Sequence, residues 1–425
     1  MKHFCNFCLE ELSTTFVDLG NSPIANNYCT DETVSRMEPY FPLKVYICDS
    51  CLLVQIPPST TREALFHRDY AYFSSYSTTW LEHSKQYAVS MIERFKLNKQ
   101  SRVIEIASND GYLLQYFKEQ AIPVLGIDPA ESVAQSAIAK GIPTLVEYFG
   151  TVMASRLKNQ GLSADLVAAN NVLAHVPDIN DFVAGFKIIL NPAGVATFEF
   201  PHILKLIENR AFDTIYHEHF SYLSFPTVEK IFAHHGLTIF DVEELTTHGG
   251  SLRIFVKHAE NGSLEISEQV TAIKQAYHDT QLDMLEGYKN FQSQVETIKR
   301  SLLNTLITLK NHGKKIAGYG APAKGNTLLN YCGIRTDFLD YTVDRNPHKQ
   351  GFYLPGTHIP IKPVEALIES KPDCILILPW NLKDEIISQL RPLCSWNPLY
   401  LTPFSIEDPY DVPRTPSTRS LSHNL

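Results

Sequence analysis

The segment Tyr216-His217-Glu218-His219 places two histidines, a carboxylate and a phenol in four consecutive positions. A histidine held by a carboxylate or a phenol can take a proton from carbon near neutral pH, and carbon alkylation beside a ketone requires that step. A metal clip or a solvated loop is the alternative, and a cluster of this kind favours the alternative when taken alone. The surrounding elements must therefore decide which interpretation holds.

Two Cys-x-x-Cys pairs near the N-terminus have the spacing of metal ligands: Cys5 with Cys8, and Cys48 with Cys51. Each pair presents two thiolates on one turn, so together they complete a tetrahedral zinc site with no open coordination position. A strand pattern at residues 43–47 leads into the second pair. We expect a structural Zn²⁺ here, and we interpret the other four cysteines as ordinary buried thiols (Cys29, Cys332, Cys374 and Cys394).

The central part of the chain has the pattern of a parallel sheet that binds a nucleotide-like ligand. A strand at 102–106 contains Glu105 and runs into the turn at 107–111. The next strand ends at Asp128, 23 positions after Glu105, where a carboxylate can accept hydrogen bonds from two ribose hydroxyls. The ligand of such a loop is a dinucleotide or S-adenosylmethionine.

The glycine content of the loop favours the methyl donor. Of the three glycines of a dinucleotide fingerprint, only Gly111 is present, and Ala107 and Asn109 suit the close approach of a pyrophosphate poorly. S-adenosylmethionine carries no phosphate. A further strand at 164–170 ends at Asn170 and is followed by His175, for which a core role and a site role stay equally open.

The C-terminal part is predicted to form a second α/β domain after a long helix or helix pair at 263–312. The segment 314–327 reads as strand, loop and helix, in which free helix amides and Lys324 could bind a phosphate. Tight strand–helix packing is an alternative explanation of its glycines. The strand at 338–344 ends at Asp344, and the tail after 405 is expected to be loosely ordered.

Length and composition bound the remaining possibilities. A chain of 425 residues suggests two or three domains, and 44% hydrophobic with 20% charged residues is typical of a globular enzyme. The net charge of -9 without a basic block argues against nucleic-acid binding. No apolar run approaches the roughly 20 residues that span a bilayer, and no signal region precedes the first cysteines. We therefore expect a cytoplasmic protein without a membrane contact, and a monomer.

The order of these motifs resembles the nucleotide-sugar C-methyltransferases, in particular the C3-methyltransferases of dTDP-4-keto-6-deoxysugars. The resemblance covers roughly residues 2–405 and is most specific at 108–111, 216–219 and 318–325. It implies an α/β chain with a zinc-binding domain (1–75), a Rossmann-like methyl-donor domain (76–262), a Rossmann-like domain for the nucleotide sugar (263–405) and a tail (406–425). The sugar would lie in a cleft between the last two domains.

The resemblance also implies roles for individual residues. His219 maps onto the base, Glu218 and Tyr216 onto neighbours that position it, and His175 and Tyr70 onto residues that approach the sugar. Tyr70 lies in an aromatic segment, 67–77, which as a pattern is equally a packing loop. The donor-binding residues would be Glu105, Ser108, Asn109, Gly111, Asp128, Asn170 and Asn171. The residues expected at the nucleotide sugar are Tyr319, Lys324, Gly325 and Asp344.

Three other functions are compatible with parts of the chain. Methylation of an oxygen or a nitrogen on another nucleotide-linked metabolite would need no ketone, and it is the main alternative. A zinc-ribbon adaptor would predict a degraded donor loop or base cluster, and both are intact. An NAD-dependent redox enzyme is disfavoured because Gly318 and Gly320 lack a third glycine and no hydride partner is evident.

Overall fold

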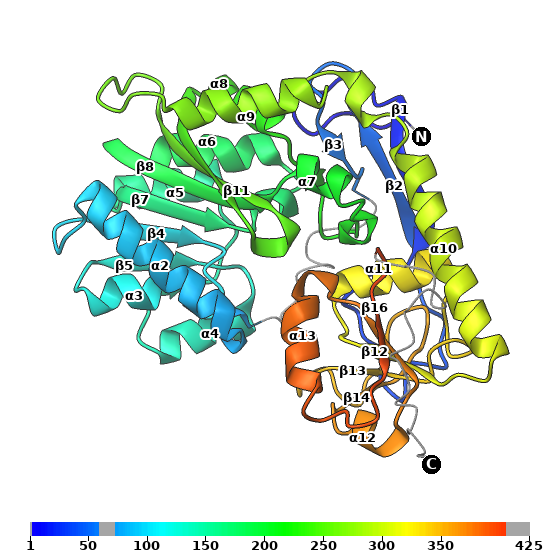
Figure 1. Cartoon of the computed structure of the whole chain (residues 1–425). Helices are drawn as coiled ribbons and strands as arrows, with labels where there is room; N and C mark the ends of the chain where they lie inside the picture. The colour runs from blue at the N-terminus through cyan, green and yellow to red at the C-terminus, as the bar shows by residue number, and fades with distance from the viewer. Residues whose placement is uncertain (1, 59–72, 405–425) are drawn as a thin grey trace, which may run out of the picture. The chain divides into compact units, whose positions relative to one another are not determined.

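The computed structural model of the chain describes residues 2–58 and 73–404 (Figure 1). Its contacts group into two compact units. Unit 1 contains the N-terminal residues up to 25 and residues 38–292, and unit 2 contains residues 26–37 and the chain from 293 onward. The motif-based domain boundaries at 75, 262 and 405 stay a prediction.

Unit 1 is built on a seven-stranded sheet in the order β10-β11-β8-β7-β4-β5-β6. Five strands run parallel, because each is followed by a helix that returns the chain to the same edge. They are β4 (Val103–Ile106), β5 (Val124–Ile127), β6 (Thr144–Leu145), β7 (Ala164–Asn170) and β8 (Leu190–Pro201). The antiparallel strands β10 (Leu237–Leu245) and β11 (Ser251–His258) extend the sheet beyond β8.

Helices cover both faces of this sheet. One face packs on α2 (Thr78–Phe95), α3 (Leu114–Glu119) and α4 (Glu131–Ala139). Helix α2 begins where the Ser77 side chain accepts from the Trp80 amide, and it ends at Lys96, whose φ of 52° turns the chain away. The other face packs on α6 (Ile179–Ile189) and α8 (Phe225–His234) through a stack of phenylalanine rings. Helix α5 (Thr151–Asn159) lies beside α6.

A second, four-stranded sheet in unit 1 has the order β1-β2-β3-β9. Its first three strands are β1 (Thr14–Ser22), β2 (Phe41–Ile47) and β3 (Val54–Gln55), so the predicted strand at 43–47 is confirmed. The fourth, β9 (Ser221–Tyr222), comes from a distant part of the chain and pairs antiparallel with β3. The second cysteine pair and the Tyr-His-Glu-His segment therefore flank strands of one sheet.

Two helices close unit 1 and lead into unit 2. Helix α9 (Glu268–Asp279) and helix α10 (Phe291–Asn311) form a pair with a short turn, η5 (Leu285–Tyr288), between them. The predicted helix pair is thus confirmed. Within unit 1, the ring of Phe291 stacks on Phe16 of β1 with their centroids 4.7 Å apart, which fixes the start of α10 against the smaller sheet.

Unit 2 is an all-parallel five-stranded sheet in the order β14-β13-β12-β15-β16. Its strands are β12 (Ile316–Tyr319), β13 (Thr342–Val343), β14 (Ile361–Lys362), β15 (Cys374–Ile377) and β16 (Leu399–Leu401). Its helices are α11 (Ala323–Cys332), α12 (Ala366–Ser370) and α13 (Lys383–Leu390). The predicted strand at 338–344 is shorter than expected, because only two of its residues pair with β12 and β14.

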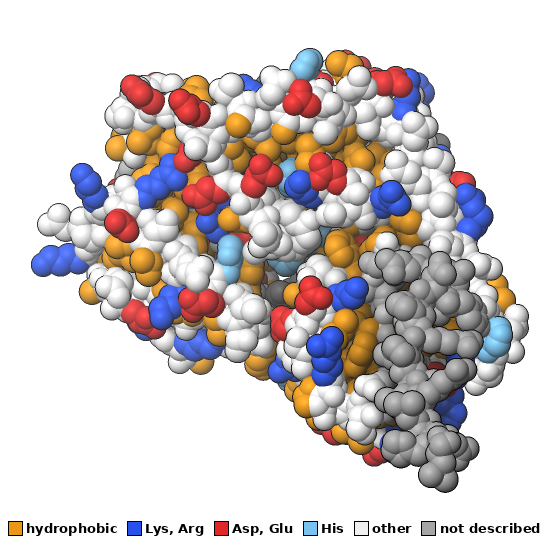
Figure 2. Space-filling view, viewed as in Figure 1, with side chains coloured by type: hydrophobic (Ala, Val, Ile, Leu, Met, Phe, Trp, Pro, Cys, Tyr) orange, Lys and Arg blue, Asp and Glu red, His pale blue; other side chains and the backbone are white. Residues whose placement is uncertain are grey.

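These two units confirm the predicted α/β class. On the face shown in Figure 2, acidic and basic side chains alternate over the surface. Among the described residues, no helix has an apolar stretch long enough to cross a membrane. The four cysteines expected to be ordinary thiols are buried in the structure (Cys29, Cys332, Cys374 and Cys394).

Candidate active site and metal centre

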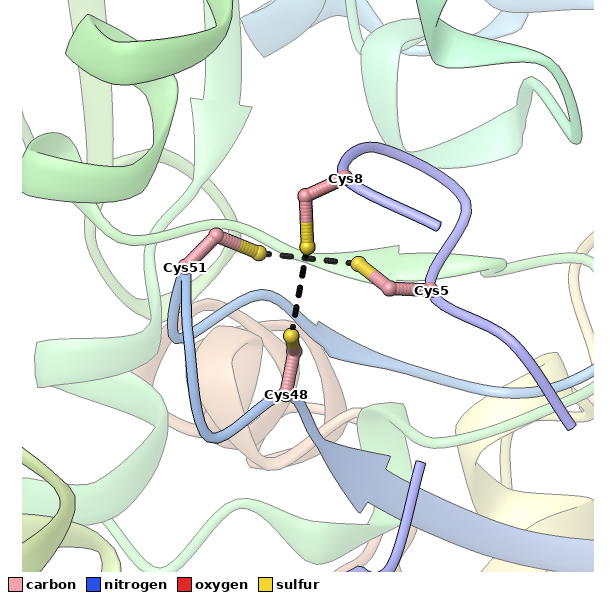
Figure 3. A group of neighbouring side chains, drawn as sticks. All are labelled: Cys5, Cys8, Cys48 and Cys51. Carbon is pink, nitrogen blue, oxygen red and sulfur yellow. Dashed lines mark hydrogen bonds between the residues drawn. The ribbon is translucent and has the colours of Figure 1, made fainter. Parts of the chain in front are cut away.

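The four knuckle cysteines converge on one point (Figure 3). The Sγ atoms of Cys5 and Cys51 are 3.5 Å apart, those of Cys8 and Cys48 are 3.4 Å apart, and all four lie within 4.8 Å of one another. A tetrahedral site with Zn–S bonds of about 2.3 Å separates its sulfurs by about 3.8 Å. The four thiols therefore fit a zinc ion with every coordination position filled by protein.

Buried polar contacts prepare this tetrad for a metal. Hydrogen bonding with Cys51 lowers the pKa of Cys5 to about 5, so one thiolate is present near neutral pH. The side chain of Gln55 is wholly buried, and its Nε2 atom donates to Cys5 Sγ at 3.2 Å. Such N–H···S contacts orient thiolate ligands from outside the metal's coordination sphere.

The loop after β4 has the strained backbone of a ligand-binding turn. Ala107 and Asn109 have φ values of 58° and 49°, a region that side chains with a Cβ seldom occupy. The carboxylate of Asp128 holds the loop, because it accepts from the Asn109 amide at 2.8 Å and from the Ala130 amide at 2.9 Å. Burial raises the pKa of Asp128 to about 6. Each oxygen keeps a second lone pair that a ribose hydroxyl could use.

Buried oxygens without a partner mark the same end of the sheet. Ser108 Oγ, Asn170 Oδ1 and Asn171 Oδ1 find no hydrogen-bond partner within the described part of the chain. Buried polar atoms are otherwise almost always paired, so these three point to a polar ligand. Glu105 is also wholly buried, and burial together with the charges of Asp128 and Asp110 raises its pKa well above the ordinary value.

Two glycines shape this loop, and only one was predicted. A Cβ on Gly111, at φ 78°, would lie 2.4 Å from Ile142 Cδ1, so this residue permits close packing as well as the turn. The second is Gly126 in β5, where a Cβ would lie 2.5 Å from Ser108 Oγ and 2.9 Å from Thr144 Oγ1. Sequence analysis missed Gly126, because a glycine inside a strand gives no sign of what lies opposite it.

His219 has a defined tautomer and a crowded aromatic setting. Its Nδ1 atom lies 2.8 Å from the backbone oxygen of Thr214, which can only accept, so Nδ1 carries the proton and Nε2 keeps a lone pair. The ring of Tyr216 lies 4.0 Å from the His219 ring, and the ring of His175 lies 4.6 Å away. Burial and nearby His175 lower the pKa of His219 well below the ordinary value.

The predicted cluster around the base is only partly assembled as expected. His175, in the short helix η2 (Leu173–His175), does lie beside His219; its pKa falls to about 4 through burial, although a hydrogen bond to the Glu218 backbone opposes this. Thr214 supplies the Nδ1 contact, and the Tyr216 ring packs against the imidazole. The positioning role of Glu218 and Tyr216 stays a prediction. Tyr70 lies outside the described residues.

His217 faces away from the other imidazoles. Its Nε2 atom lies 3.3 Å from the Pro42 oxygen, and its ring packs edge-on against Phe41. Burial lowers its pKa, so the ring is neutral and donates to this carbonyl. His219 thus lies beside His175, whereas His217 contacts strand β2 of the four-stranded sheet.

A buried charge network that sequence analysis missed lies at the end of β8. The carboxylate of Glu199 is wholly buried and contacts Arg253 at 2.8 Å, His83 at 2.9 Å and Thr247 Oγ1 at 2.9 Å. Burial raises the pKa of Glu199, but His83 and Arg253 outweigh it and leave the pKa lowered. The Glu199 backbone oxygen also accepts from the Asn171 amide at 2.7 Å, which ties the network to the residue that follows β7.

In unit 2, the residues expected at the nucleotide sugar surround one loop. Lys324 donates to Asn381 Oδ1, and its ammonium lies 4.8 Å from the centroid of the Trp380 ring. The carboxylate of Asp344 accepts from the Ala321 amide at 2.7 Å, so it shapes the loop before any ligand is bound. Burial raises the pKa of Tyr319.

The glycine of this loop has a packing role. A Cβ on Gly325 would lie 2.9 Å from Leu378 Cβ, so helix α11 can approach β15 only with glycine there. This favours the packing alternative for Gly325. Binding of the sugar nucleotide by Tyr319, Lys324, Gly325 and Asp344 stays a prediction.

Comparisons with known proteins match most of the chain. Residues 5–66 match a family model described as a zinc binding domain, residues 80–242 match a methyltransferase domain, and residues 246–404 match a C-methyltransferase C-terminal domain. C-methyltransferase NovU of Streptomyces niveus is 32% identical over 383 residues, which are 90% of this chain and 91% of that protein.

Solved structures resemble only part of the chain. The magnesium protoporphyrin IX methyltransferase ChlM of Synechocystis PCC 6803, with bound SAH, is 14% identical and covers 41% of this chain and 82% of its own, with a TM-score of 0.34. An S-adenosylmethionine-dependent methyltransferase of Clostridium acetobutylicum ATCC 824 is 12% identical and covers 42% and 92%, also with a TM-score of 0.34.

Proposed function

Because this chain belongs to the family of S-adenosylmethionine-dependent C-methyltransferases that includes NovU, we propose that it methylates C3 of a nucleoside-diphosphate 4-keto-deoxysugar, with dTDP as the nucleotide. The predicted methyltransferase activity, methyl donor and zinc are confirmed by the family. The carbon that is methylated, the sugar and the roles of individual side chains form the proposal.

The hydrogen bond between His219 and Thr214 supports the proposal most directly. A general base needs an unprotonated nitrogen that a fixed partner keeps in one tautomer. The Thr214 carbonyl holds the proton on Nδ1, so Nε2 is the acceptor, and the lowered pKa of His219 keeps the ring neutral near pH 7. An O- or N-methyltransferase would instead need a base facing a hydroxyl or an amine, so proton exchange at C3 without the methyl donor separates the two functions.

The proposed reaction begins with proton transfer to His219. A ketone at C4 acidifies the C3–H bond, Nε2 takes the proton, and the bonding electrons move into an enolate with charge on the C4 oxygen. A donor is then needed at this oxygen. His175, whose ring lies beside that of His219, is one candidate for that role. The Tyr70 phenol is the other candidate.

Residues at the strand ends would hold the methyl donor. Bound S-adenosylmethionine supplies a methyl group on a sulfonium. C3 of the enolate would accept this methyl in line, and the S–CH₃ bond would break with S-adenosylhomocysteine as the leaving group. Asp128 would receive the ribose hydroxyls, and the unpaired oxygens of Ser108, Asn170 and Asn171 would meet the donor's polar groups. Glu105, Asn109 and Gly111 would shape the loop around it. The four-cysteine zinc has no open position and takes no part in this step.

The proposal is tested by the reaction itself. Mass spectrometry of the zinc-loaded enzyme with S-adenosylmethionine and a dTDP-4-keto-6-deoxysugar should give a product heavier by one methyl group. In D₂O without the donor, the enzyme should introduce deuterium at C3. Methyl transfer without C3 exchange would favour an oxygen or nitrogen acceptor. If ketosugars carried by several different nucleotides gave neither methylation nor deuterium uptake, a ketosugar would be excluded as the substrate.

A further inference from the structure

The zinc site and the segment that carries His219 are joined by hydrogen bonds. Strand β3 begins at Val54, three residues after Cys51, and pairs with β9, which begins at Ser221, two residues after His219. In the register, Gln55 lies opposite Ser221. Just outside the pair, the Ile56 amide donates to the Phe220 oxygen at 3.0 Å. The backbone that follows His219 is therefore fixed on the strand that leaves the second knuckle.

Gln55 connects the two sites through both its backbone and its side chain. The backbone belongs to the β3–β9 pair, while the wholly buried side chain contacts the first knuckle. Its Nε2 atom donates to Cys5 Sγ at 3.2 Å, and its Oε1 atom accepts from the Asn6 amide at 2.7 Å. One residue thus contacts a zinc ligand and also pairs with the strand beside His219.

Further contacts hold the same segment on both sides of His219. Before it, the His217 ring contacts the Pro42 oxygen at 3.3 Å, and Pro42 lies in the strand that leads to Cys48. After it, the Phe220 amide donates to the Ala174 oxygen at 2.8 Å, next to His175. The segment is therefore held between the zinc-binding sheet and η2, so a shift of that sheet would change the distance between His219 and His175.

We propose that the zinc site positions the catalytic segment, and that Gln55 is the positioning residue that transmits this constraint from the cysteines to His219. The inference rests on the proposed role of His219. The simpler view is that zinc only stabilises the N-terminal fold and that the large sheet alone places His219. The two views differ in what happens to residues 216–222 when the contact with Cys5 is removed.

The first test is Gln55→Met in the full-length, zinc-loaded enzyme. Methionine keeps the length and packing of the side chain but removes its hydrogen bonds with Cys5, the Asn6 amide and the Leu53 oxygen. The matched control is Ser13→Ala, which removes a 3.0 Å contact from the exposed Ser13 hydroxyl to Asp49 in the second knuckle and touches nothing in β9. Zinc content is measured by elemental mass spectrometry, and amide hydrogen exchange is followed by peptide.

Gln55→Met should keep its affinity for S-adenosylmethionine and its KM for the sugar, while amide exchange of residues 216–222 rises and C3 deuterium uptake falls on the order of tenfold. Ser13→Ala should match the wild type in all of these. The proposal would be overturned if a zinc-loaded Gln55→Met enzyme showed the wild-type rate of amide exchange at 216–222 and the wild-type rate of deuterium uptake at C3 of the sugar. An equal rise in amide exchange in β7 and in 216–222 would also overturn it, because the substitution would then have destabilised the whole of unit 1.

A second measurement covers the case in which Gln55→Met does not fold. Zinc is removed from the wild-type enzyme with a chelator, and peptide-level exchange is compared with that of the zinc-loaded enzyme. Protection should be lost at 41–56 and 216–222 and kept in β7. If 216–222 keeps its protection without zinc, the coupling does not exist. This measurement needs no substrate, so it tests the coupling independently of the proposed C3 chemistry. The C3 chemistry would be disproved separately, by the absence of C3 deuterium uptake in the wild-type enzyme.

Discussion

The guanidinium of Arg253 lies 2.8 Å from the carboxylate of Glu199, and neither side chain is more than 7% exposed. The two residues face each other across neighbouring antiparallel strands, β11 and β8, where Arg253 is the direct partner of Glu199. Arg253 also lies over the Tyr87 ring of α2, 4.8 Å from its centroid. The pair and the ring contact therefore join helix α2 to strands β8 and β11.

Replacing Arg253 by methionine should strongly destabilise unit 1. The change leaves Glu199 buried with only His83 and Thr247 as partners, and breaking a buried ion pair in this way typically costs about 3–5 kcal/mol. Unfolding in urea measures the loss. Arg156→Met, which removes an exposed pair with Glu147, should behave as the wild type. An equally mild effect of both variants would show that the buried pair contributes little.

His219→Asn should abolish C3 exchange without abolishing binding. The asparagine amide can still donate to the Thr214 oxygen, as Nδ1 does, but nothing replaces the Nε2 lone pair. Loss of a general base typically costs about 10²–10⁴-fold in rate. Deuterium uptake at C3 and calorimetric titration with S-adenosylmethionine measure the two properties. The control is His278→Asn on the exposed face of α9; C3 uptake at the wild-type rate in His219→Asn would exclude His219 as the base.

The pH profile of C3 exchange should lack an acid limb near the ordinary histidine value. Burial, followed by the influence of His175, places the pKa of His219 well below 6.5. The neutral, proton-accepting ring therefore persists as the pH falls through 6.5, and the rate should show no decline centred near the ordinary histidine pKa. Initial rates of deuterium uptake in buffered D₂O test this. A fall in rate centred near pH 6.5 would contradict the buried setting of the ring.

Stability should decrease in acid because of His202. This buried residue donates to or accepts from the Tyr277 hydroxyl at 2.8 Å, and burial lowers its pKa to about 3 from 6.5. Below pH 6.5, His202 becomes protonated in the unfolded chain but stays neutral in the folded one. The free energy of unfolding therefore falls between pH 6.5 and pH 3, by no more than about 1.4 kcal/mol per pH unit. His202→Asn should reduce the slope of this dependence in urea unfolding between pH 7 and 5, and the lowered pKa values of His175, His217 and His219 should account for the slope that remains. An unchanged slope would contradict it.

Gly126→Ala should weaken both the fold and methyl-donor binding. The added Cβ would lie 2.5 Å from Ser108 Oγ, and forcing an extra carbon into a packed site typically costs about 1–3 kcal/mol. Because Ser108 lies in the donor loop, calorimetry should show weaker binding of S-adenosylmethionine. Gly262→Ala is the control, since its Cβ would meet nothing within 4 Å. If Gly126→Ala bound S-adenosylmethionine with wild-type affinity, Ser108 would not be part of the proposed donor-binding site.

Local patterns in the sequence were enough to predict the parts that depend on local chemistry. The zinc cysteines, the strand that ends near Glu105 and the helix pair after residue 263 all follow from spacing, periodicity or breakers, and the structure contains them. Asp128 was expected at a strand end and lies there, under the Asn109 amide.

Contacts made by the backbone or by distant segments could not be predicted. The acceptor for His219 is the Thr214 carbonyl, and every residue carries such a group, so the side-chain type gives no signal. Strand β9 has only two residues and exists because β3 pairs with it. Likewise, residues 26–37 join unit 2 through the mutual backbone hydrogen bonds of Cys29 and Tyr353, a pairing that no periodicity records.

The borders of the seven-stranded sheet bear on how the protein behaves at high concentration. Its two outermost strands are β6, which has two residues, and β10, whose register shifts between Ile239 and Asp241. Short or bulged border strands give another molecule little straight backbone to pair with, and natural sheets use both to resist edge-to-edge aggregation. Strand β11, whose eight residues are all buried, lies inside this border. In the described part of the chain, this sheet thus leaves only β6 and β10 as border strands that another molecule could pair with.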